Sequence, residues 1–202
     1  MNLLLIFCKP ALAGGVKTRL AREVGTETAV AVYQTLCEKT RKIAQEWGGT
    51  VAVFHASPWE ESTPWKELGP HQQLQKGSDL GSRMAQAFQW GFEQGYNRIV
   101  IIGSDLWTLT ADDLNQAFAS LNQHSVVWGP ATDGGYYLLG LSQYRPELFS
   151  DLPWSQEDLW HLSQKRVPKE EQHSLRVQND IDTLEDVLAN AELKHLFRRH
   201  LP

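Results

Sequence analysis

This sequence of 202 residues has few cysteines, no long apolar run and no excess of basic charge. Its two cysteines, Cys8 and Cys37, are too few for a disulfide framework and lack the spacing of a metal site. No stretch approaches the roughly 20 apolar residues that span a membrane, and residues 1–10 lack the basic segment and cleavage site of a secretory signal. The net charge of −5 argues against a nucleic-acid partner. These absences predict a cytoplasmic protein that works without membrane or nucleic acid.

The composition that remains is that of a folded protein. Hydrophobic residues make up 42% of the chain and charged residues 21%, and eight tryptophans supply more apolar surface than a disordered chain leaves in water. No repeat, low-complexity segment or linker divides the sequence. Residues 1–202 are therefore predicted to form a single domain.

Predicted strands and helices alternate along the chain. The clearest strand is the apolar run 98–103, and residues 26–47 carry one apolar stripe at helical spacing. Thr110, with Asp113 three residues later, predicts a capped helix that runs to Leu121. Further strands are expected at 3–8, 50–55, 71–76, 125–128, 136–141 and 173–178, and further helices at 79–94, 156–164 and from 183 onward. This alternation predicts an α/β fold with a mostly parallel sheet covered on both faces.

Ligands of such sheets bind beyond the carboxyl ends of the strands, so the loops that follow strands are the candidate sites. In the first of these loops, the backbone of Gly14 and Gly15 could approach an anion, and Lys17 and Arg19 would add positive charge. The loop is not a P-loop, because Val16 separates the glycines from the lysine. A solvated surface turn is the alternative interpretation.

Three aspartates are candidate metal ligands. Asp105 directly follows the clearest strand, where a carboxylate can hold Mg²⁺, although it could instead cap the next turn. Asp180 and Asp182 are two positions apart and would point to the same side of an extended backbone. Asp182 could alternatively cap the last helix, with Glu185 completing a capping box. Together the three carboxylates predict an oxygen-rich site for Mg²⁺ or Mn²⁺.

Two more loops contain candidate substrate contacts. Asp133-Gly134-Gly135 predicts a hairpin turn that could also contact an anion or a sugar. In the segment 76–83, the glycine spacing at a helix start would admit a base or a phosphate, whereas an ordinary capped helix start is the alternative. The run Pro153-Trp154-Ser155 is expected to cap the next helix, and its aromatic ring could also face an acceptor.

These motifs, taken in order, resemble a known family. The pattern comprises Gly-x-Val-Lys-Thr-Arg-Leu, Gly-x-Asp-Leu-Gly-x-Arg, Ile-Ile-Gly-Ser-Asp, Gly-Pro-Ala-x-Asp-Gly-Gly-Tyr-Tyr-Leu-Leu-Gly-Leu and Asp-x-Asp-Thr-x-Glu-Asp. From residue 3 to about residue 188 it resembles the DUF2064 family, which is glycosyltransferase-like and belongs to the nucleotide-diphospho-sugar transferase (GT-A) superfamily. The resemblance extends to the 2-phospholactate, phosphoenolpyruvate and molybdenum-cofactor guanylyltransferases. It implies a three-layer α/β/α sandwich around a mostly parallel mixed sheet.

The resemblance also implies roles for residues. Lys17, Arg19 and Asp105 would be the catalytic residues, and Asp105, Asp180 and Asp182 would hold the metal. The remaining substrate contacts would come from Gly15, Leu80, Gly81, Arg83, Asp133, Gly134 and Gly135. In one departure from the family pattern, Leu106 and Trp107 stand where a proline usually follows the metal aspartate, and Trp107 would enlarge that turn.

The expected activity is a metal-dependent transfer from a nucleoside triphosphate or a nucleotide-sugar to a small-molecule acceptor. Nucleotidyl transfer and glycosyl transfer both remain open. The alternative, motivated by Trp107, is a protein of the same fold that binds nucleotide without turnover. A purely structural interaction module would not explain why five motifs follow one another in the loops where ligands of such sheets bind. The sequence does not fix the oligomeric state, and a homodimer is compatible with it.

Overall fold

The seven strands of the described residues belong to one sheet, with the order β3-β2-β1-β4-β6-β5-β7. The computed structural model describes residues 1–12, 14–58, 64–154 and 156–201. Its strands are β1 (Asn2–Cys8), β2 (Thr50–His55), β3 (Gln72–Leu74), β4 (Arg98–Ile102), β5 (Val126–Pro130), β6 (Tyr136–Leu141) and β7 (Gln172–Ser174). All seven correspond to predicted strands, within a few residues at their ends.

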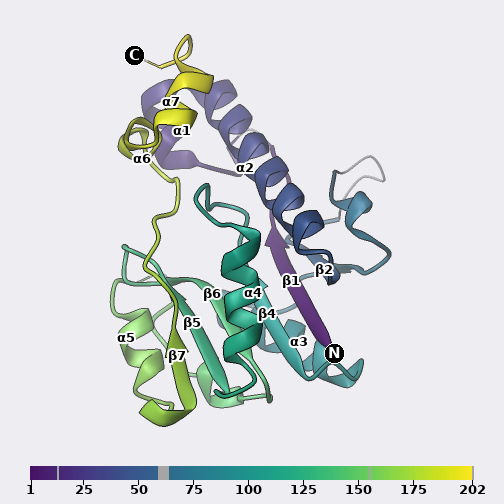
Figure 1. The fold of residues 1–202 in the computed structure, drawn as a ribbon. Helices are drawn as coiled ribbons and strands as arrows, with labels where there is room; N and C mark the ends of the chain where they lie inside the picture. Colours follow the sequence, from purple (N-terminus) through teal and green to yellow (C-terminus); the bar gives the residue numbers. More distant parts are fainter. Residues whose placement is uncertain (13, 59–63, 155, 202) are drawn as a thin grey trace.

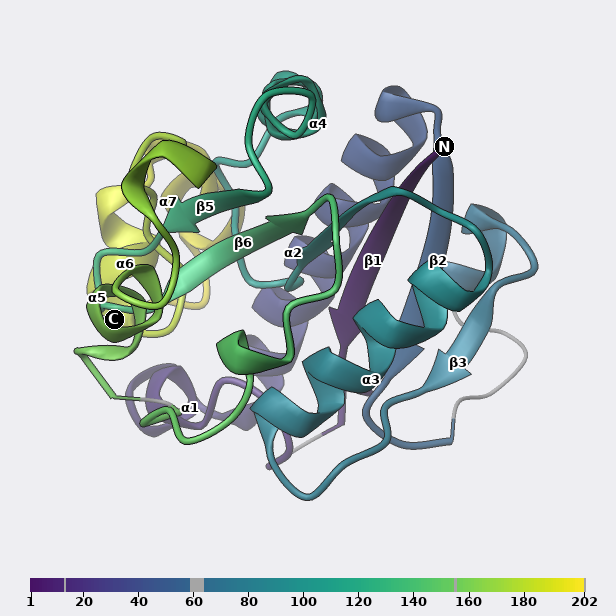
Figure 2. The ribbon, with the colours of Figure 1, turned by 90° about the horizontal axis from the view of Figure 1, so that it is seen from below.

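Helices cover both faces of the sheet and make the fold a three-layer α/β/α sandwich. Figure 2 shows α3 on one face, with α2 and α4 on the other. The helices are α1 (Thr18–Val24), α2 (Thr26–Trp47), α3 (Leu80–Glu93), α4 (Ala111–Ser120), α5 (Leu159–Gln164), α6 (Leu184–Ala189) and α7 (Ala191–Phe197), with short 3₁₀ turns η1 (Pro64–Leu68), η2 (Pro146–Leu148) and η3 (Lys169–Glu171).

The sheet is mixed because β6 runs antiparallel to both of its neighbours, β4 and β5. The predicted hairpin thus joins β5 to β6 through the Asp133-Gly134-Gly135 turn. The chain first builds outward from β1 through β2 to β3, and then crosses back to place β4 on the other side of β1. This reversal of strand order at the carboxyl ends of β1 and β4 is the usual position of a ligand site in open α/β sheets.

Three apolar clusters hold the layers together. One packs α2 and α4 on the sheet, and the second packs α3 on the opposite face. The third lies beyond the edge of the sheet, where α1, α6 and α7 gather against α2 (Figure 1). Trp107 is buried in this third cluster together with Ile181 and Leu36. The C-terminal helices are thereby attached to the loop that follows β4.

Some predicted boundaries were wrong. Helix α1 falls in a segment predicted to be a loop, and the predicted C-terminal helix is two helices, α6 and α7, with Asn190 as the N-cap of the second. Helix α5 begins at Leu159 after Asp158, so the segment 153–155 does not cap it; Ser155 lies outside the described residues. The connection 57–70 contains the short turn η1, and 59–63 lie outside the described residues. Within the described ranges, no helix has the length and hydropathy needed to cross a membrane.

Candidate active site

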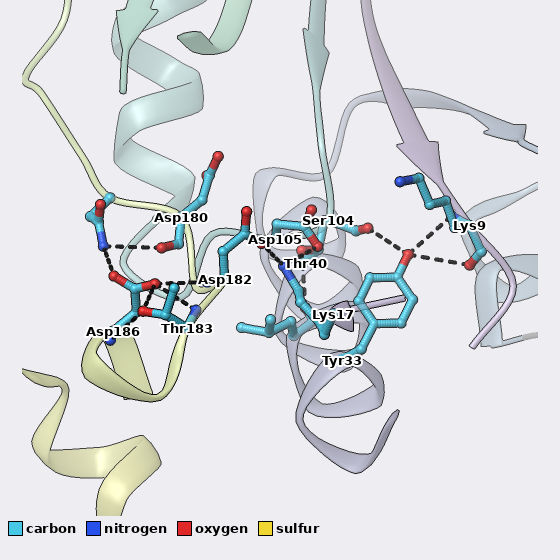
Figure 3. A network of polar contacts seen from close by, with 12 residues as sticks. Lys9, Lys17, Tyr33, Thr40, Ser104, Asp105, Asp180, Asp182, Thr183 and Asp186 are labelled. Carbon is cyan, nitrogen blue, oxygen red and sulfur yellow. Dashed lines mark hydrogen bonds and ion pairs between the residues drawn. The ribbon is translucent and has the colours of Figure 1, made fainter. Parts of the chain in front are cut away.

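Lys17 lies at the centre of the loop that follows β1. Its backbone has a left-handed conformation (φ 48°), which is rare outside glycine and costs about 1–2 kcal/mol. This conformation starts α1 and turns the side chain inward, where it is 8% exposed. The Nζ atom lies 2.9 Å from Oδ1 of Asp105 and 2.7 Å from Oδ1 of Asp182 (Figure 3). Burial lowers the pKa of Lys17, but the two carboxylates outweigh it and raise the pKa above its ordinary value.

Backbone contacts bring Asp180 and Asp182 to Asp105. The N–H of Ile181 donates to the carbonyl oxygen of Asp105 over 3.0 Å, which docks the segment between β7 and α6 on the loop after β4. The buried Gln178 extends this docking, because its side chain accepts a 2.6 Å hydrogen bond from Thr108. The three aspartates, which we call the acid cluster, therefore meet at one edge of the sheet.

The alternative interpretation, in which Asp182 caps the last helix, is wrong. The N-cap of α6 is Thr183, and the capping box is completed by Asp186 rather than Glu185. Oδ2 of Asp186 accepts from the N–H groups of both Asp182 and Thr183, over 2.9 and 2.7 Å. Because Thr183 and Asp186 satisfy the helix start, the carboxylate of Asp182 remains available to Lys17.

Asp180 has the most perturbed carboxyl group of the cluster. Burial, reinforced by the negative charges of Asp105 and Asp182, raises its pKa to about 7. Carboxylates that repel one another in this way are stabilised by a cation among them. Lys17 supplies one such charge in the present arrangement.

Tyr33 on α2 joins the two loops at the strand-order reversal. Its hydroxyl accepts a 3.0 Å hydrogen bond from the N–H of Lys9, lies 3.2 Å from the Lys9 carbonyl oxygen and lies 3.0 Å from Oγ of Ser104. The loop after β1 is thus fixed relative to the loop after β4. Tyr33 falls within the apolar helical stripe of residues 26–47, and its hydroxyl is the one feature of the sequence that could have indicated this second role.

The acid cluster borders a polar depression of 530 Å³, lined by Lys9, Gly15, Val16, Lys17, Thr18, Arg19, Tyr33, Asp105 and Asp182. This volume falls within the range of about 300–1,000 Å³ found for small-molecule sites. Arg19 is exposed on the first turn of α1. Three cationic side chains and the backbone of Gly15 therefore face a common space beside two carboxylates.

A second, wide depression contains the hairpin turn. Its lining includes Asp133, Gly134 and Gly135 on one side and Asp180, Asp182 and Arg19 on the other. Gly134 has φ +85°, and a Cβ atom there would lie 1.7 Å from the Glu157 carbonyl oxygen. The Gly134 carbonyl in turn accepts a 2.9 Å hydrogen bond from the N–H of Trp160. The turn is thus held against the segment that leads into α5.

The start of α3 does not present its glycine to a ligand. Gly81 is buried, and a Cβ atom on it would lie 2.3 Å from the indole of Trp154. Trp154 occupies the space where a base or a phosphate was expected to approach the backbone. Arg83 donates to the carbonyl oxygen of Gly77 and does not line either depression, whereas Leu80 lines the wide depression.

The acid cluster has the donor chemistry for a hard divalent cation. Three carboxylates converge, and Oδ1 of Asp105 is buried without a well-aligned hydrogen bond from the described residues, although Lys17 lies 2.9 Å away. As the side chains stand, no three Asp, Glu, His or Cys residues in the described part of the chain adopt the arrangement of a metal site. The Lys17 ammonium lies between two of the three acids, so a metal would require it to move aside.

Trp107 does not enlarge the site. Its indole is 8% exposed in the third apolar cluster, with Nζ of Lys39 5.6 Å above the ring. Leu106 is buried in the first cluster. The departure from the family pattern thus contributes to packing of the C-terminal segment.

Known proteins resemble the chain at the level of the family and the fold. Residues 39–156 match DUF2064, a family described as uncharacterized proteins conserved in bacteria. The chain belongs to this family. A crystal structure from Desulfovibrio desulfuricans G20, of a protein provisionally named a nucleotide-diphospho-sugar transferase, has a TM-score of 0.85 at 30% identity, over 98% of this chain and 90% of that chain. No curated protein matches the chain.

More distant structures share the fold of this DUF2064 protein. A CMP:2-keto-3-deoxy-manno-octonic acid synthetase complexed with CTP has a TM-score of 0.59 at 11% identity, over 99% of both chains. Rv0371c from Mycobacterium tuberculosis H37Rv, in complex with manganese, has a TM-score of 0.56 at 13% identity, over 100% of this chain and 98% of that chain. At these identities the likeness establishes the fold, which is that of nucleotidyl and nucleotide-sugar transferases.

Proposed function

We propose that this DUF2064 protein is a metal-dependent transferase that acts on a nucleoside triphosphate or a nucleotide-sugar. The observation that carries the proposal is that Asp105 and Asp182 pair with Lys17 at the strand-order reversal, with Asp180 close enough to feel their charges. A cluster of acids beside a cation-lined depression suits a ligand that combines phosphates with a divalent metal. The fold shared with the CTP-bound synthetase and the manganese-bound Rv0371c supports the same ligand class.

The three aspartates would hold Mg²⁺ or Mn²⁺, which supplies neutralising charge for a phosphate chain. Lys17 and Arg19 line the polar depression and would bind the phosphate oxygens, together with the backbone of Gly15. Lys17 would exchange its contacts with Asp105 and Asp182 for contacts with phosphate. The chain thereby provides positive charge where negative charge develops on the leaving group.

The acceptor would enter from the wide depression. In nucleotidyl transfer, an acceptor oxygen forms a bond to the α-phosphorus, and pyrophosphate leaves with the electron pair of the broken P–O bond. In glycosyl transfer, the acceptor oxygen forms a bond to the sugar carbon, and a nucleoside diphosphate leaves with the electron pair of the broken C–O bond. The turn formed by Asp133, Gly134 and Gly135 lines this depression opposite Asp180 and would orient the acceptor or the donor sugar.

A test of the activity is to incubate the protein with Mn²⁺ or Mg²⁺, a panel of nucleoside triphosphates and nucleotide-sugars, and a library of small acceptors. Pyrophosphate release identifies a nucleotidyltransferase, and release of a nucleoside diphosphate identifies a glycosyltransferase. Asp105→Asn removes one charge from the acid cluster and is expected to lower either rate at least about a hundredfold. Asp112→Asn, an exposed change on α4, is the matched control.

The second candidate is a nucleotide-binding protein without turnover. It is favoured by the ion pairs of Lys17, which satisfy two of the three carboxylates without a metal. It predicts tight nucleotide binding that does not need a divalent cation and yields no product across the panel.

A further inference from the structure

An apolar cavity lies directly beside the acid cluster. It has a volume of 160 Å³ and its apolar lining includes Phe7, Leu80, Met84, Leu138, Trp154 and Leu159. Asp105 and Asp180 line the same cavity and supply its charged end. The cavity thus runs from two of the acids into the space between α3, α5 and the start of β6.

The strand register explains why this space exists. The last residue of β4, Ile102, pairs with Leu138, so β6 continues past the end of β4 through Tyr137 and Tyr136. Helix α3 contributes Leu80 and Met84 from one side, and Trp154 closes over the start of the helix because Gly81 leaves room for its indole. The apolar walls therefore come from separate elements that pack around one end of the sheet.

The volume sets the size of an occupant. A cavity of about 150 Å³ lined by Leu, Ile and Phe stays dry and binds benzene. At 160 Å³, this cavity accommodates one six-membered ring or a short branched alkyl group. A pair of fused rings would have to extend beyond it into the adjoining wide depression.

The polarity of the lining sets the chemistry of an occupant. Besides the two acids, the polar side chains of the lining are the tyrosines, Tyr136 and Tyr137, and the indole of Trp154. The Tyr137 hydroxyl already donates to the carbonyl oxygen of Arg176, whereas the buried Tyr136 hydroxyl has no hydrogen-bond partner among the described residues. A sugar or a nucleobase has several polar atoms that would lose water here without replacement. The cavity suits an apolar group with at most one polar substituent.

The cavity also opens into the space assigned to the reaction. Asp105 lines both the cavity and the polar depression. Leu80, Tyr136, Leu159 and Asp180 line both the cavity and the wide depression. A group seated in the cavity would therefore leave its attached polar atoms at the acid cluster, beside the proposed phosphate site.

We propose that the acceptor of this protein is a small molecule in which an oxygen nucleophile is attached to one aromatic ring or a short branched aliphatic group, and that this group is held in the apolar cavity. The assignment as acceptor rests on the proposed transferase function. The presence of the cavity and its preference for an apolar ring over a sugar or a base are independent of that function.

Benzyl alcohol is a direct probe, because it joins one ring to one hydroxyl. We expect saturation-transfer NMR on the full chain to detect its binding, and glycerol, which has hydroxyls without the ring, to give no signal. 1-Naphthylmethanol carries the same hydroxyl on two fused rings and is expected to bind at least about tenfold more weakly, a difference of about 1.4 kcal/mol. This size series needs no mutation.

Two substitutions fill the cavity from different elements. Leu159→Trp and Met84→Phe are each expected to weaken benzyl alcohol binding at least about tenfold in protein that still unfolds cooperatively. Leu188→Phe, on an exposed position of α6, is the control and should leave binding unchanged. Equal binding of benzyl alcohol and 1-naphthylmethanol, unchanged binding in the folded cavity variants, or displacement of benzyl alcohol by free cytidine or guanosine would each overturn the inference.

Nucleotide binding separates this inference from the proposed function. If CTP or GTP stabilises the protein in the presence of Mn²⁺ while benzyl alcohol does not bind, the transferase proposal stands and the apolar acceptor is overturned. If benzyl alcohol binds and is lost in both cavity variants while no nucleotide binds, the apolar site is supported and the transferase proposal fails.

Discussion

The side-chain ammonium of Lys17 donates a 2.7 Å hydrogen bond to Oδ1 of Asp182, and this contact joins the loop after β1 to the segment before α6. The same ammonium lies 2.9 Å from Asp105, so one cation holds three separate parts of the chain together. The site and the C-terminal helices are therefore coupled. Any ligand that displaces Lys17 must supply positive charge in its place.

Removing this charge should destabilise the protein. Lys17→Met leaves the carboxylates facing one another, and loss of one partner of a buried pair costs about 3–5 kcal/mol. Because Asp105 and Asp182 are 43% and 50% exposed, water screens part of this repulsion, and we expect a loss of about 1–2 kcal/mol in urea unfolding. The exposed Lys9, changed to Met, is the matched control. Millimolar Mn²⁺ should restore part of the loss in Lys17→Met; a loss unaffected by the metal would contradict the cation-holding role of the acids.

Lys17→Gly separates charge from backbone strain. Glycine adopts the left-handed conformation (φ 48°) without the penalty of a Cβ atom, although it also loses more entropy on folding. We expect the glycine variant to be more stable than the methionine variant by about 1 kcal/mol. Equal stabilities of the two variants in the same urea titration would show that the lysine backbone is not strained.

Tyr33→Phe should loosen the two loops at the strand-order reversal. The change removes a buried hydroxyl from contacts with Lys9 and Ser104 and leaves the Lys9 N–H without its acceptor. Such losses cost about 1–3 kcal/mol. Ser104→Ala and the double variant complete a cycle, in which the two losses should not add because the groups share one bond. Additive losses would mean that Tyr33 and Ser104 act independently.

Gly134→Ala should displace the hairpin turn. The new Cβ atom would lie 1.7 Å from the Glu157 carbonyl oxygen, so the turn or the segment before α5 must move. Gly95 is a close control, since its φ is +86° and a Cβ atom there meets nothing within 4 Å. We expect Gly95→Ala to cost about 1 kcal/mol from backbone conformation alone, and Gly134→Ala at least twice that. Similar melting temperatures for the two variants would contradict the tight packing of this turn.

The ion pair between the buried Asp113 and the exposed Arg176 should make stability depend on pH below 4. Burial raises the pKa of Asp113, but hydrogen bonds from Arg176 and Thr110 outweigh it and hold the pKa below the ordinary value of 3.8. A lowered carboxyl pKa contributes stability that is present above pH 3.8 and is lost as the pH falls through the folded-state value. In urea titrations between pH 5 and 2, Asp113→Asn should reduce the fall in the free energy of unfolding with decreasing pH. Asp112→Asn, on the exposed side of α4, should leave this pH dependence unchanged.

Local sequence patterns correctly predicted those helices and strands that are determined by residues close together in the sequence. The apolar stripe of α2, the continuous apolar run of β4 and the Thr110–Asp113 capping box were all confirmed. Helix α1 was missed because it has only seven residues and its N-cap, Lys17, has a left-handed backbone conformation. The ion pairs of Lys17 with Asp105 and Asp182 form only in the folded chain, so nothing in the sequence indicated this helix start. The split between α6 and α7 lacks a glycine or proline that would have marked it.

The site was predicted less completely because it is built from distant contacts. At the start of α6, the spacing of Asp182 to Glu185 and that of Thr183 to Asp186 both fit a capping box, and the ion pair to Lys17 decides between them. The hydroxyl role of Tyr33 depends on two loops that meet only in the folded chain. Trp154 was predicted to lie near a helix cap or an acceptor, and its packing on Gly81 could not be read from either residue alone.

The most direct test of the central claim is the thermal stability of the protein with a nucleoside triphosphate, with Mn²⁺, and with both together. If the acid cluster holds a metal that bridges to phosphates, the metal and nucleotide together should stabilise the fold by more than the sum of their separate effects. The total stabilisation should reach about 2.7 kcal/mol when the metal–nucleotide complex is at a hundredfold excess over its Kd. Asp105→Asn should abolish the joint effect, and Asp112→Asn should retain it. A joint effect that survives in Asp105→Asn, or nucleotide binding that is independent of Mn²⁺ in the unmodified protein, would contradict the proposed site.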